Sequence, residues 1–298
     1  MAAALALVLA GLAVTACRES RAPVAEFEAR PARLDLAWPE YREIELAFDP
    51  IAQLPAGGEP PIVFLHLLDE PGSVVRTFDH PLPGSWAPGK PLRYRVRLYQ
   101  SALAEPLPPG EYLLSAGLYR PGDGRFALRT AAEEVAPQEY RIATVDVAAA
   151  GERMPHARFS ETWRPTEPGA DRQVLARRTL AGGGVTGTVQ FGPVEGAGRL
   201  HLSLLVPGGE GAHEHLEILD GGPQPKIRIG STCGGGQPEL AGTGRFEVDL
   251  DLPAAAGARL CEITIATNFQ VTSPERAEAD SVRLEVLSWS PAANAETP

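Results

Sequence analysis

The sequence predicts an all-β protein built from two β-sandwich domains behind an export signal. Three observations favour this fold class. The 298 residues include 31 Gly and 29 Pro but only 9 Phe, 6 Tyr and 4 Trp, and turn-forming residues at this density leave little room for long helices. Several segments alternate apolar and polar residues with the period of a half-buried strand. Pro-Gly and Asp-Gly pairs, which are typical of turns, lie between these segments.

An apolar segment at the N-terminus predicts export. Residues 2–16 contain only Ala, Leu, Val, Gly and Thr, which matches a signal-peptide core and is too short to cross a bilayer. The segment ends in Val-Thr-Ala before Cys17 and resembles a bacterial lipobox. This resemblance implies cleavage between Ala16 and Cys17 and a lipid anchor on the Cys17 thiol. The alternative is a signal peptide cleaved elsewhere, with Cys17 incidental.

The export signal places the protein in a bacterial cell envelope, facing the periplasm or the cell surface. Arg18 directly after the cysteine favours the outer membrane under the enterobacterial sorting pattern. The net charge of −11 argues against nucleic acid as a partner and against electrostatic binding to anionic lipid. Lipid at Cys17 is therefore the expected contact with the membrane.

The first domain is expected over residues 32–148, after a signal peptide (1–16) and a charged, lipidated tether (17–31). Its clearest strand is 92–98, where four apolar residues alternate with three arginines. Tyr112 is expected to place its ring in the core and its hydroxyl near a loop carbonyl. Six to eight short strands separated by turns suggest an immunoglobulin-like sandwich; further candidates are 43–48, 62–68, 111–119, 125–129 and 140–147.

The second domain is expected over residues 159–291, between a linker (149–158) and a disordered tail (292–298). About eight strands of similar length suggest a jelly-roll sandwich of the galactose-binding-like class. Asp249 and Asp251 alternate with apolar residues and predict an exposed strand face. The candidate strands are 173–180, 185–191, 199–206, 215–219, 226–229, 245–252, 260–267 and 281–289.

Three runs, one in the first domain and two in the second, resemble parts of a known class of bacterial membrane proteins. Residues 108–125 read as Pro-Pro-Gly, a strand bearing Tyr112, Gly-Leu-Tyr and a Gly-containing hairpin. This run is similar to the end of extracytoplasmic β-sandwich modules appended to bacterial membrane sugar transferases of the mannosyltransferase type. Residues 263–269 and 280–286 resemble jelly-roll modules of the same proteins. The resemblance implies two sandwich modules, and it implies no transferase activity because no later apolar run is long enough to span a membrane.

Two cysteines remain once Cys17 is assigned to lipid. Cys233 and Cys261 both lie in the second domain, and an oxidising envelope compartment favours a disulfide between them. The alternative, two free thiols, requires a cytoplasmic protein and conflicts with the export signal.

The candidate metal ligands fall into two groups. His213, His215 and Glu217 share one face of a strand and could hold Zn²⁺ or Cu²⁺, with His201 able to approach from another strand. The simpler interpretation, which we favour, is a solvent-exposed strand face. Oxygens of Glu161, Glu278 and Asp280 could hold a structural Ca²⁺ if the two ends of the jelly roll meet; we otherwise expect no cofactor.

Two tryptophans are candidates for stacking on sugar rings. Trp86 lies in a loop rich in Pro and Gly, and Trp163 lies near a domain edge. The alternative is that each ring closes the end of its own sandwich, and the sequence favours that alternative.

The function expected from these features is that of a non-catalytic envelope lipoprotein that binds a glycan or an envelope protein. The first alternative is an assembly factor of a surface-polysaccharide or envelope complex that binds protein only. A hydrolase on the jelly-roll scaffold is a further alternative. The chain contains neither Gly-x-Ser-x-Gly nor Ser-x-x-Lys, and its Gly-rich runs do not open a phosphate-binding helix.

Overall fold

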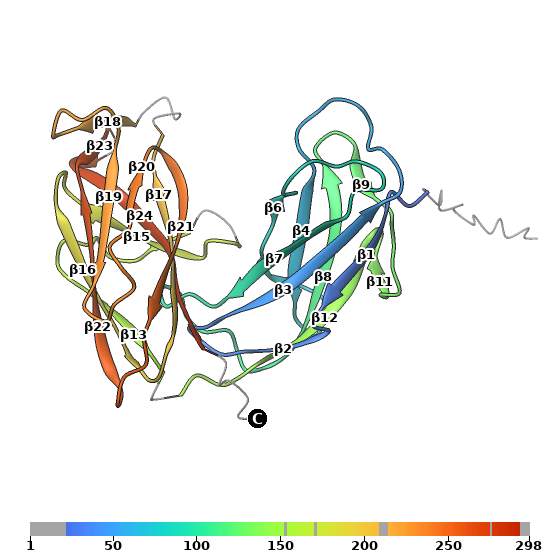
Figure 1. Cartoon of the computed structure of the whole chain (residues 1–298), viewed down its shortest axis with the longest axis horizontal. Coiled ribbons are helices and arrows are strands. Elements are labelled where there is room, and N and C mark those ends of the chain that lie inside the picture. The colour runs from blue at the N-terminus through green and yellow to red at the C-terminus, as the bar shows by residue number, and fades with distance from the viewer. Residues whose placement is uncertain (1–21, 152–153, 170–171, 209–213, 275, 293–298) are drawn as a thin grey trace, which may run out of the picture.

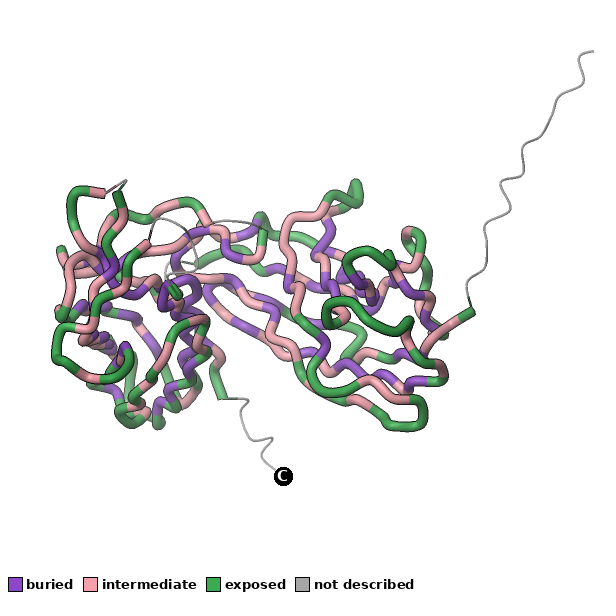
Figure 2. The backbone as a smooth tube through the Cα atoms, turned by 90° about the horizontal axis from the view of Figure 1, so that it is seen from above, coloured by how far each residue is buried: buried purple, intermediate pink, exposed green. Residues whose placement is uncertain are grey.

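The computed structural model describes residues 22–151, 154–169, 172–208, 214–274 and 276–292. These residues form β-strands and no helix, which confirms the all-β fold class. The strands build four sheets, two from residues 25–147 and two from residues 156–291 (Figure 1). Buried and exposed positions alternate along some strands, for example over residues 25–28 and 247–252, and buried positions predominate along others (Figure 2). Alternation is expected where one face of a sheet packs on another.

The first sandwich has a four-stranded and an eight-stranded sheet. The smaller sheet has the order β10 (Leu128–Arg129), β1 (Ala25–Arg30), β3 (Tyr41–Pro50) and β7 (Leu92–Tyr99). The larger has the order β11 (Glu134–Ala136), β12 (Glu139–Val147), β8 (Gly110–Arg120), β4 (Ile62–Leu68) and β5 (Val74–Thr77); β2 (Arg33–Leu36), β6 (His80–Pro81) and β9 (Gly124–Phe126) pair at its sides. One apolar core lies between the two sheets.

The second sandwich has a five-stranded and a seven-stranded sheet. The smaller sheet has the order β13 (His156–Phe159), β16 (Thr186–Val194), β22 (Arg259–Thr267), β19 (Lys226–Ser231) and β20 (Glu239–Ala241). The larger has the order β14 (Glu167–Pro168), β15 (Ala176–Ala181), β24 (Arg276–Pro291), β17 (Gly198–Val206) and β21 (Gly244–Leu252), with β18 (His215–Ile218) and β23 (Phe269–Ser273) beside it.

Several strands lie outside the predicted ranges, and two of them fall in segments that were expected to be the tether and the linker. Part of the expected tether forms β1, which pairs antiparallel with β3. Ala25 and Phe27 are buried there while Glu26 and Glu28 are exposed, so the segment has the two-residue period, but only one large apolar residue makes it visible. The expected linker 149–158 likewise ends inside β13, which pairs with β16.

The two sandwiches are joined by more than the chain connection. Leu103, in the loop after β7, is 8% exposed and belongs to the apolar core of the second sandwich. Next to it, Ala102 N–H donates to Leu287 O at 2.8 Å, and Trp289 N–H donates to Pro39 O at 2.8 Å. Because these backbone bonds lie on both sides of an inserted side chain, they fix the relative orientation of the two sandwiches.

Candidate functional site

A cleft of about 490 Å³ lies between the two sandwiches. Binding sites occur preferentially at domain interfaces, and this volume is typical of a site for a small ligand. The first sandwich contributes β7 and the segment around β6, and the second contributes the outer face of the β17–β21 sheet (Figure 1). Its lining residues from these elements include Tyr94, Arg95, Arg97, His80, Pro81, Pro83, His201, Ser203, Arg245 and Glu247.

Strand alternation places the polar side chains of the cleft. In β17 and β21, His201 lies opposite Asp249 and Ser203 opposite Glu247, while the residues between them, such as Leu202 and Val248, are buried in the core. These four polar residues therefore share the outer face of the sheet. That face is turned toward the first sandwich.

His201 lies at the centre of a charged cluster that joins the two domains. Its Nδ1 lies 2.9 Å from Asp249 Oδ1 and 2.9 Å from Arg97 Nη1, and its Nε2 lies 3.0 Å from Glu247 Oε2. Arg97 of the first sandwich donates to Asp249 Oδ2 at 2.6 Å. Ser203 donates to the remaining oxygen of Glu247 at 2.9 Å. Both carboxylates are thus held by cations or donors from the cluster itself.

The cluster shifts the ionisation of its members. Burial of His201 by itself lowers the pKa of the imidazole, but hydrogen bonds to Asp249 and Glu247 outweigh burial and raise it. Burial raises the pKa of each carboxyl, and the hydrogen bonds and charges of His201 and the neighbouring residues together outweigh burial and lower it. The imidazole thus bridges two carboxylates of its own sandwich, and Arg97 joins this group to the first sandwich.

A neutral histidine lines the opposite wall. His80 Nδ1–H donates to Phe78 O at 2.9 Å, so Nε2 accepts a hydrogen bond from the Tyr94 hydroxyl at 2.9 Å. Burial lowers the pKa of His80 and raises that of Tyr94. Pro81 and Pro83 are exposed beside this pair, which gives the wall an apolar surface next to hydrogen-bonding groups. Such a combination suits recognition of a ligand by contact and hydrogen bonding.

The structure changes the interpretation of both candidate tryptophans. Trp163 is 4% exposed and packs edge-on against Phe159, so neither face of its ring is open to a sugar. Trp86 is half-buried, donates from Nε1 to Ala52 O at 2.9 Å and packs near Phe48. Both rings are engaged by their own sandwich, and neither lines the interdomain cleft.

The histidine candidates for a metal site are not brought together among the residues described. His213 lies outside them. His215 and Glu217 are exposed on β18, where Glu217 accepts a hydrogen bond from Gln270 at 2.7 Å. His201 lies in the interdomain cluster and not beside His215. The part of the chain that the structure describes has no group of three His, Cys, Asp or Glu that could hold a metal ion.

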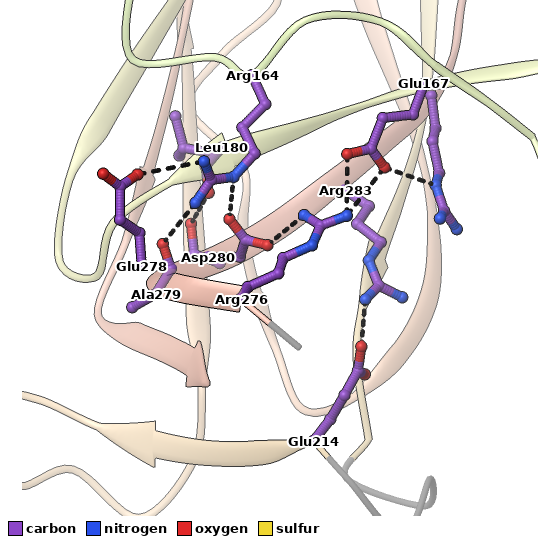
Figure 3. A network of polar contacts seen from close by, with 11 residues as sticks. Arg164, Glu167, Leu180, Glu214, Arg276, Glu278, Ala279, Asp280 and Arg283 are labelled. Atoms are coloured by element: carbon purple, nitrogen blue, oxygen red, sulfur yellow. Dashed lines mark hydrogen bonds and ion pairs between the residues drawn. The ribbon is translucent and has the colours of Figure 1, made fainter. Parts of the chain in front are cut away.

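The acidic candidates for Ca²⁺ are mostly held by arginines. Asp280 accepts from Arg164 at 2.5 Å and from Arg276 at 2.6 Å, and Glu278 lies 3.3 Å from Arg164 (Figure 3). Glu161 lies in an exposed turn after β13. Because guanidinium groups occupy the carboxylate oxygens of Glu278 and Asp280, these residues form an ion-pair network.

Only one of the two cysteine predictions concerns residues that the structure describes. The disulfide between Cys233 and Cys261 is present. Ala16 and Cys17 lie outside the described part. No helix within the described residues is long and apolar enough to cross a membrane.

Sequence reasoning missed the interdomain cluster. The predicted exposure of Asp249 and Asp251 on β21 is confirmed, but the sequence did not show that Asp249 is bonded to Arg97 of the other sandwich. The available signal was a row of arginines on one strand, 92–98, and a row of acids on another, 245–252. Alternation shows that each row points outward from its own sheet, but it does not show that the two rows meet.

Comparisons with known proteins add little to this geometry. No family model matches the chain, and no curated protein matches it. The secreted serine protease VesC from Vibrio cholerae is 10% identical, with a TM-score of 0.27 over 89% of this chain and 51% of the protease. Salmonella alpha-2-macroglobulin reacted with methylamine is 11% identical, with a TM-score of 0.25 over 91% of this chain and 17% of that chain. The chain spans about half of the protease and under a fifth of the macroglobulin, and both TM-scores are too low to support an argument about fold or activity.

Proposed function

We propose that this protein is a non-catalytic, lipid-anchored binding protein of the bacterial envelope whose ligand site is the interdomain cleft. The observation that carries the proposal is a cleft of about 490 Å³ between two sandwiches that are joined by backbone hydrogen bonds and by the ion pair of Arg97 with Asp249. A cleft with fixed walls binds without a large ordering cost. The ligand is a glycan or a polypeptide of the envelope.

The chemistry of the cleft supports binding over catalysis. The second sandwich contributes one carboxylate, Glu247, to the lining of the cleft. Glu247 and the adjacent Asp249 both contact His201. Ser203 is 3% exposed and its hydroxyl donates to Glu247, so the hydroxyl is buried and engaged in a hydrogen bond within its own sheet. Apolar proline surface and exposed arginines remain for contact with a ligand.

The lipid anchor is tested by replacing its cysteine. We expect Cys17→Ser to move the protein from the membrane to the soluble fraction and to abolish labelling by fatty-acid analogues, because the thiol that carries the acyl chains is gone. Fractionation and metabolic labelling of the wild-type and variant proteins measure this. Membrane association that is unchanged in the variant contradicts the anchor and leaves the cleft proposal untouched.

The cleft is tested by filling it. Pro83 is exposed and lines the cleft, whereas Pro71 is exposed in a turn remote from it. We expect Pro83→Trp to abolish binding to arrays of envelope glycans and peptides by occupying the site, and Pro71→Trp to retain it. Absence of binding by the wild-type protein, or equal binding by the two variants, contradicts the proposal.

A further inference from the structure

Strand β7 is the edge of its sheet and borders the cleft along its length. It is the last strand in the order β10-β1-β3-β7 and pairs with β3 on one side only. The consecutive residues 94–97 all line the cleft. Consecutive side chains of a strand point to opposite faces of the sheet, so a cleft that touches all four lies beside the edge of β7 and not on one face. The backbone edge of β7 is therefore part of the site.

The side chains along this edge have a marked charge pattern. Arg93 and Arg95 point outward and are 58% and 68% exposed. Their carboxylate contacts, Asp49 at 3.9 Å and Glu43 at 3.4 Å, are long and lie on β3. The row of arginines thus has an acidic row on the β3 side, and among the described residues no strand pairs with β7 on the other side. Opposite charges on neighbouring strands stabilise pairing, and like charges oppose it.

The charge pattern selects the kind of strand that fits beside β7. A second copy of β7 would place its arginines against Arg93 and Arg95, so the edge disfavours self-association. An acidic strand would place carboxylates on the unoccupied side of the same arginines. The exposed prolines Pro81 and Pro83 offer an apolar wall for the alternate side chains.

The size of the cleft sets how far such a strand can enter. A residue in a packed sheet occupies roughly 160 Å³, given a strand spacing of about 4.8 Å, a sheet spacing of about 10 Å and a rise of about 3.3 Å. The cleft of about 490 Å³ therefore holds about three extended residues. Its inner end is closed where Arg97 reaches across to Asp249, so a strand beside Arg95 ends near Arg97. Arg93 lies two residues before Arg95 on β7, just outside the residues that line the cleft.

We propose that an extended, acidic polypeptide segment adds to the free edge of β7 as a new strand, with carboxylates opposite Arg93 and Arg95 and apolar side chains against Pro81 and Pro83. This inference rests on the proposed function and names the ligand class of the same cleft. Main-chain hydrogen bonds to β7 provide affinity, and the alternating side chains provide specificity.

The test uses a blocked six-residue peptide of alternating Glu and Val, titrated into the full-length protein. In an extended peptide, alternate backbone N–H groups point to the same side. One peptide is N-methylated at its odd residues and a second at its even residues. We expect one of the two to bind about tenfold or more weaker than the parent, because its methyl groups replace hydrogen bonds to β7, and the other to bind within about twofold of the parent.

A pair of arginine variants tests the charge pattern. Arg95 and Arg228 are both exposed strand arginines with a carboxylate at 3.4 Å, but Arg228 lies on β19, away from the cleft. We expect Arg95→Glu to weaken binding of the Glu-Val peptide about tenfold or more. Arg228→Glu should change the affinity for the same peptide by less than about twofold. A Lys-Val peptide is expected to bind weakly or not at all.

The outcomes separate this inference from the proposed function. Failure of the Glu-Val peptide to bind, equal effects of the two N-methylation patterns, or no effect of Arg95→Glu overturns strand addition at β7. If the peptide fails while Pro83→Trp still abolishes binding to a glycan, the cleft remains a binding site and its ligand is not a strand. If no ligand responds to Pro83→Trp, both proposals fall.

Discussion

Replacing both Cys233 and Cys261 with alanine is expected to lower the free energy of unfolding of the second sandwich by about 3–4 kcal/mol. The disulfide joins residues separated by 28 positions, and closing a loop of that length restricts the unfolded chain by this amount in the chain-entropy model. Cys261 is fully buried and Cys233 is 7% exposed, so the bridge lies in the core between β19 and β22. Urea unfolding measured by circular dichroism gives the loss directly.

Two further measurements test whether the disulfide itself causes the difference in stability. Wild-type protein unfolded in the presence of a thiol reductant should lose about the same stability as the double variant, because both lack the cross-link. The same reductant added to the double variant should cause no further loss, because that protein has no bridge between these positions to reduce. A double variant whose urea midpoint equals that of the oxidised wild type would show that the bridge contributes nothing.

The second large effect is expected at His66 in the first sandwich. His66 Nδ1 lies 3.3 Å from Glu139 Oε1, and its Nε2 lies 3.7 Å from Asp79 Oδ1. Burial by itself lowers the pKa of the imidazole, but the bonds to the two carboxylates outweigh it and raise the pKa to about 9. The bond from His66 contributes most to lowering the pKa of Glu139 to about 2, with help from Ser115 and Arg125.

These shifts predict how stability depends on pH. The contribution of His66 to the free energy of unfolding is fully present below the imidazole pKa of the unfolded chain, about 6.5. This contribution is lost as the pH rises through about 9. The side chain is 17% exposed, and the difference between the two pKa values corresponds to about 3 kcal/mol. The contribution of Glu139 has the opposite sense: it is present above about pH 4.5 and is lost as the pH falls toward 2.

The measurement compares wild type with His66→Gln across the same range. When the pH is raised from about 6 to about 10, the free energy of unfolding of the wild type, measured with urea, should fall by about 3 kcal/mol more than that of the variant. His201 is present in both proteins, so its contribution to the pH dependence cancels when the variant is compared with the wild type. The remaining difference in the free energy of unfolding comes from His66. His215→Gln, at an exposed position on β18, serves as the control and should follow the wild type. Parallel pH profiles for wild type and His66→Gln would contradict the assignment.

Much of the fold was predictable from local patterns. The segment 92–98 appears as β7 because its apolar residues alternate strictly, and the predicted bond of the Tyr112 hydroxyl is present, to Pro108 O at 2.9 Å. Strand β1 was missed because its alternation depends on Phe27 and small alanines, which give a weak apolar signal. Its burial comes from pairing with β3, a contact that no local pattern contains.

The candidate site was less predictable than the fold. Trp163 was considered for ligand binding because it lies near a domain edge, but the chain around it folds inward and buries the ring. The insertion of Leu103 into the second core was equally hidden, since a leucine in a loop carries no information about which domain will cover it. Both depend on contacts between residues far apart in the sequence.

The sequence by itself determined the fold class, the core-facing side of strands that alternate strictly, such as β7, and the pairing of Cys233 with Cys261, because periodicity and composition are local properties and only two cysteines remain after Cys17. The tertiary structure decided which outward faces meet. Arg97 and Asp249 each belong to an exposed face by alternation, and they become partners only because Leu103 and the backbone bonds beside it dock the two sandwiches. The cleft is a product of that docking, and so is the position of the free edge of β7 within it.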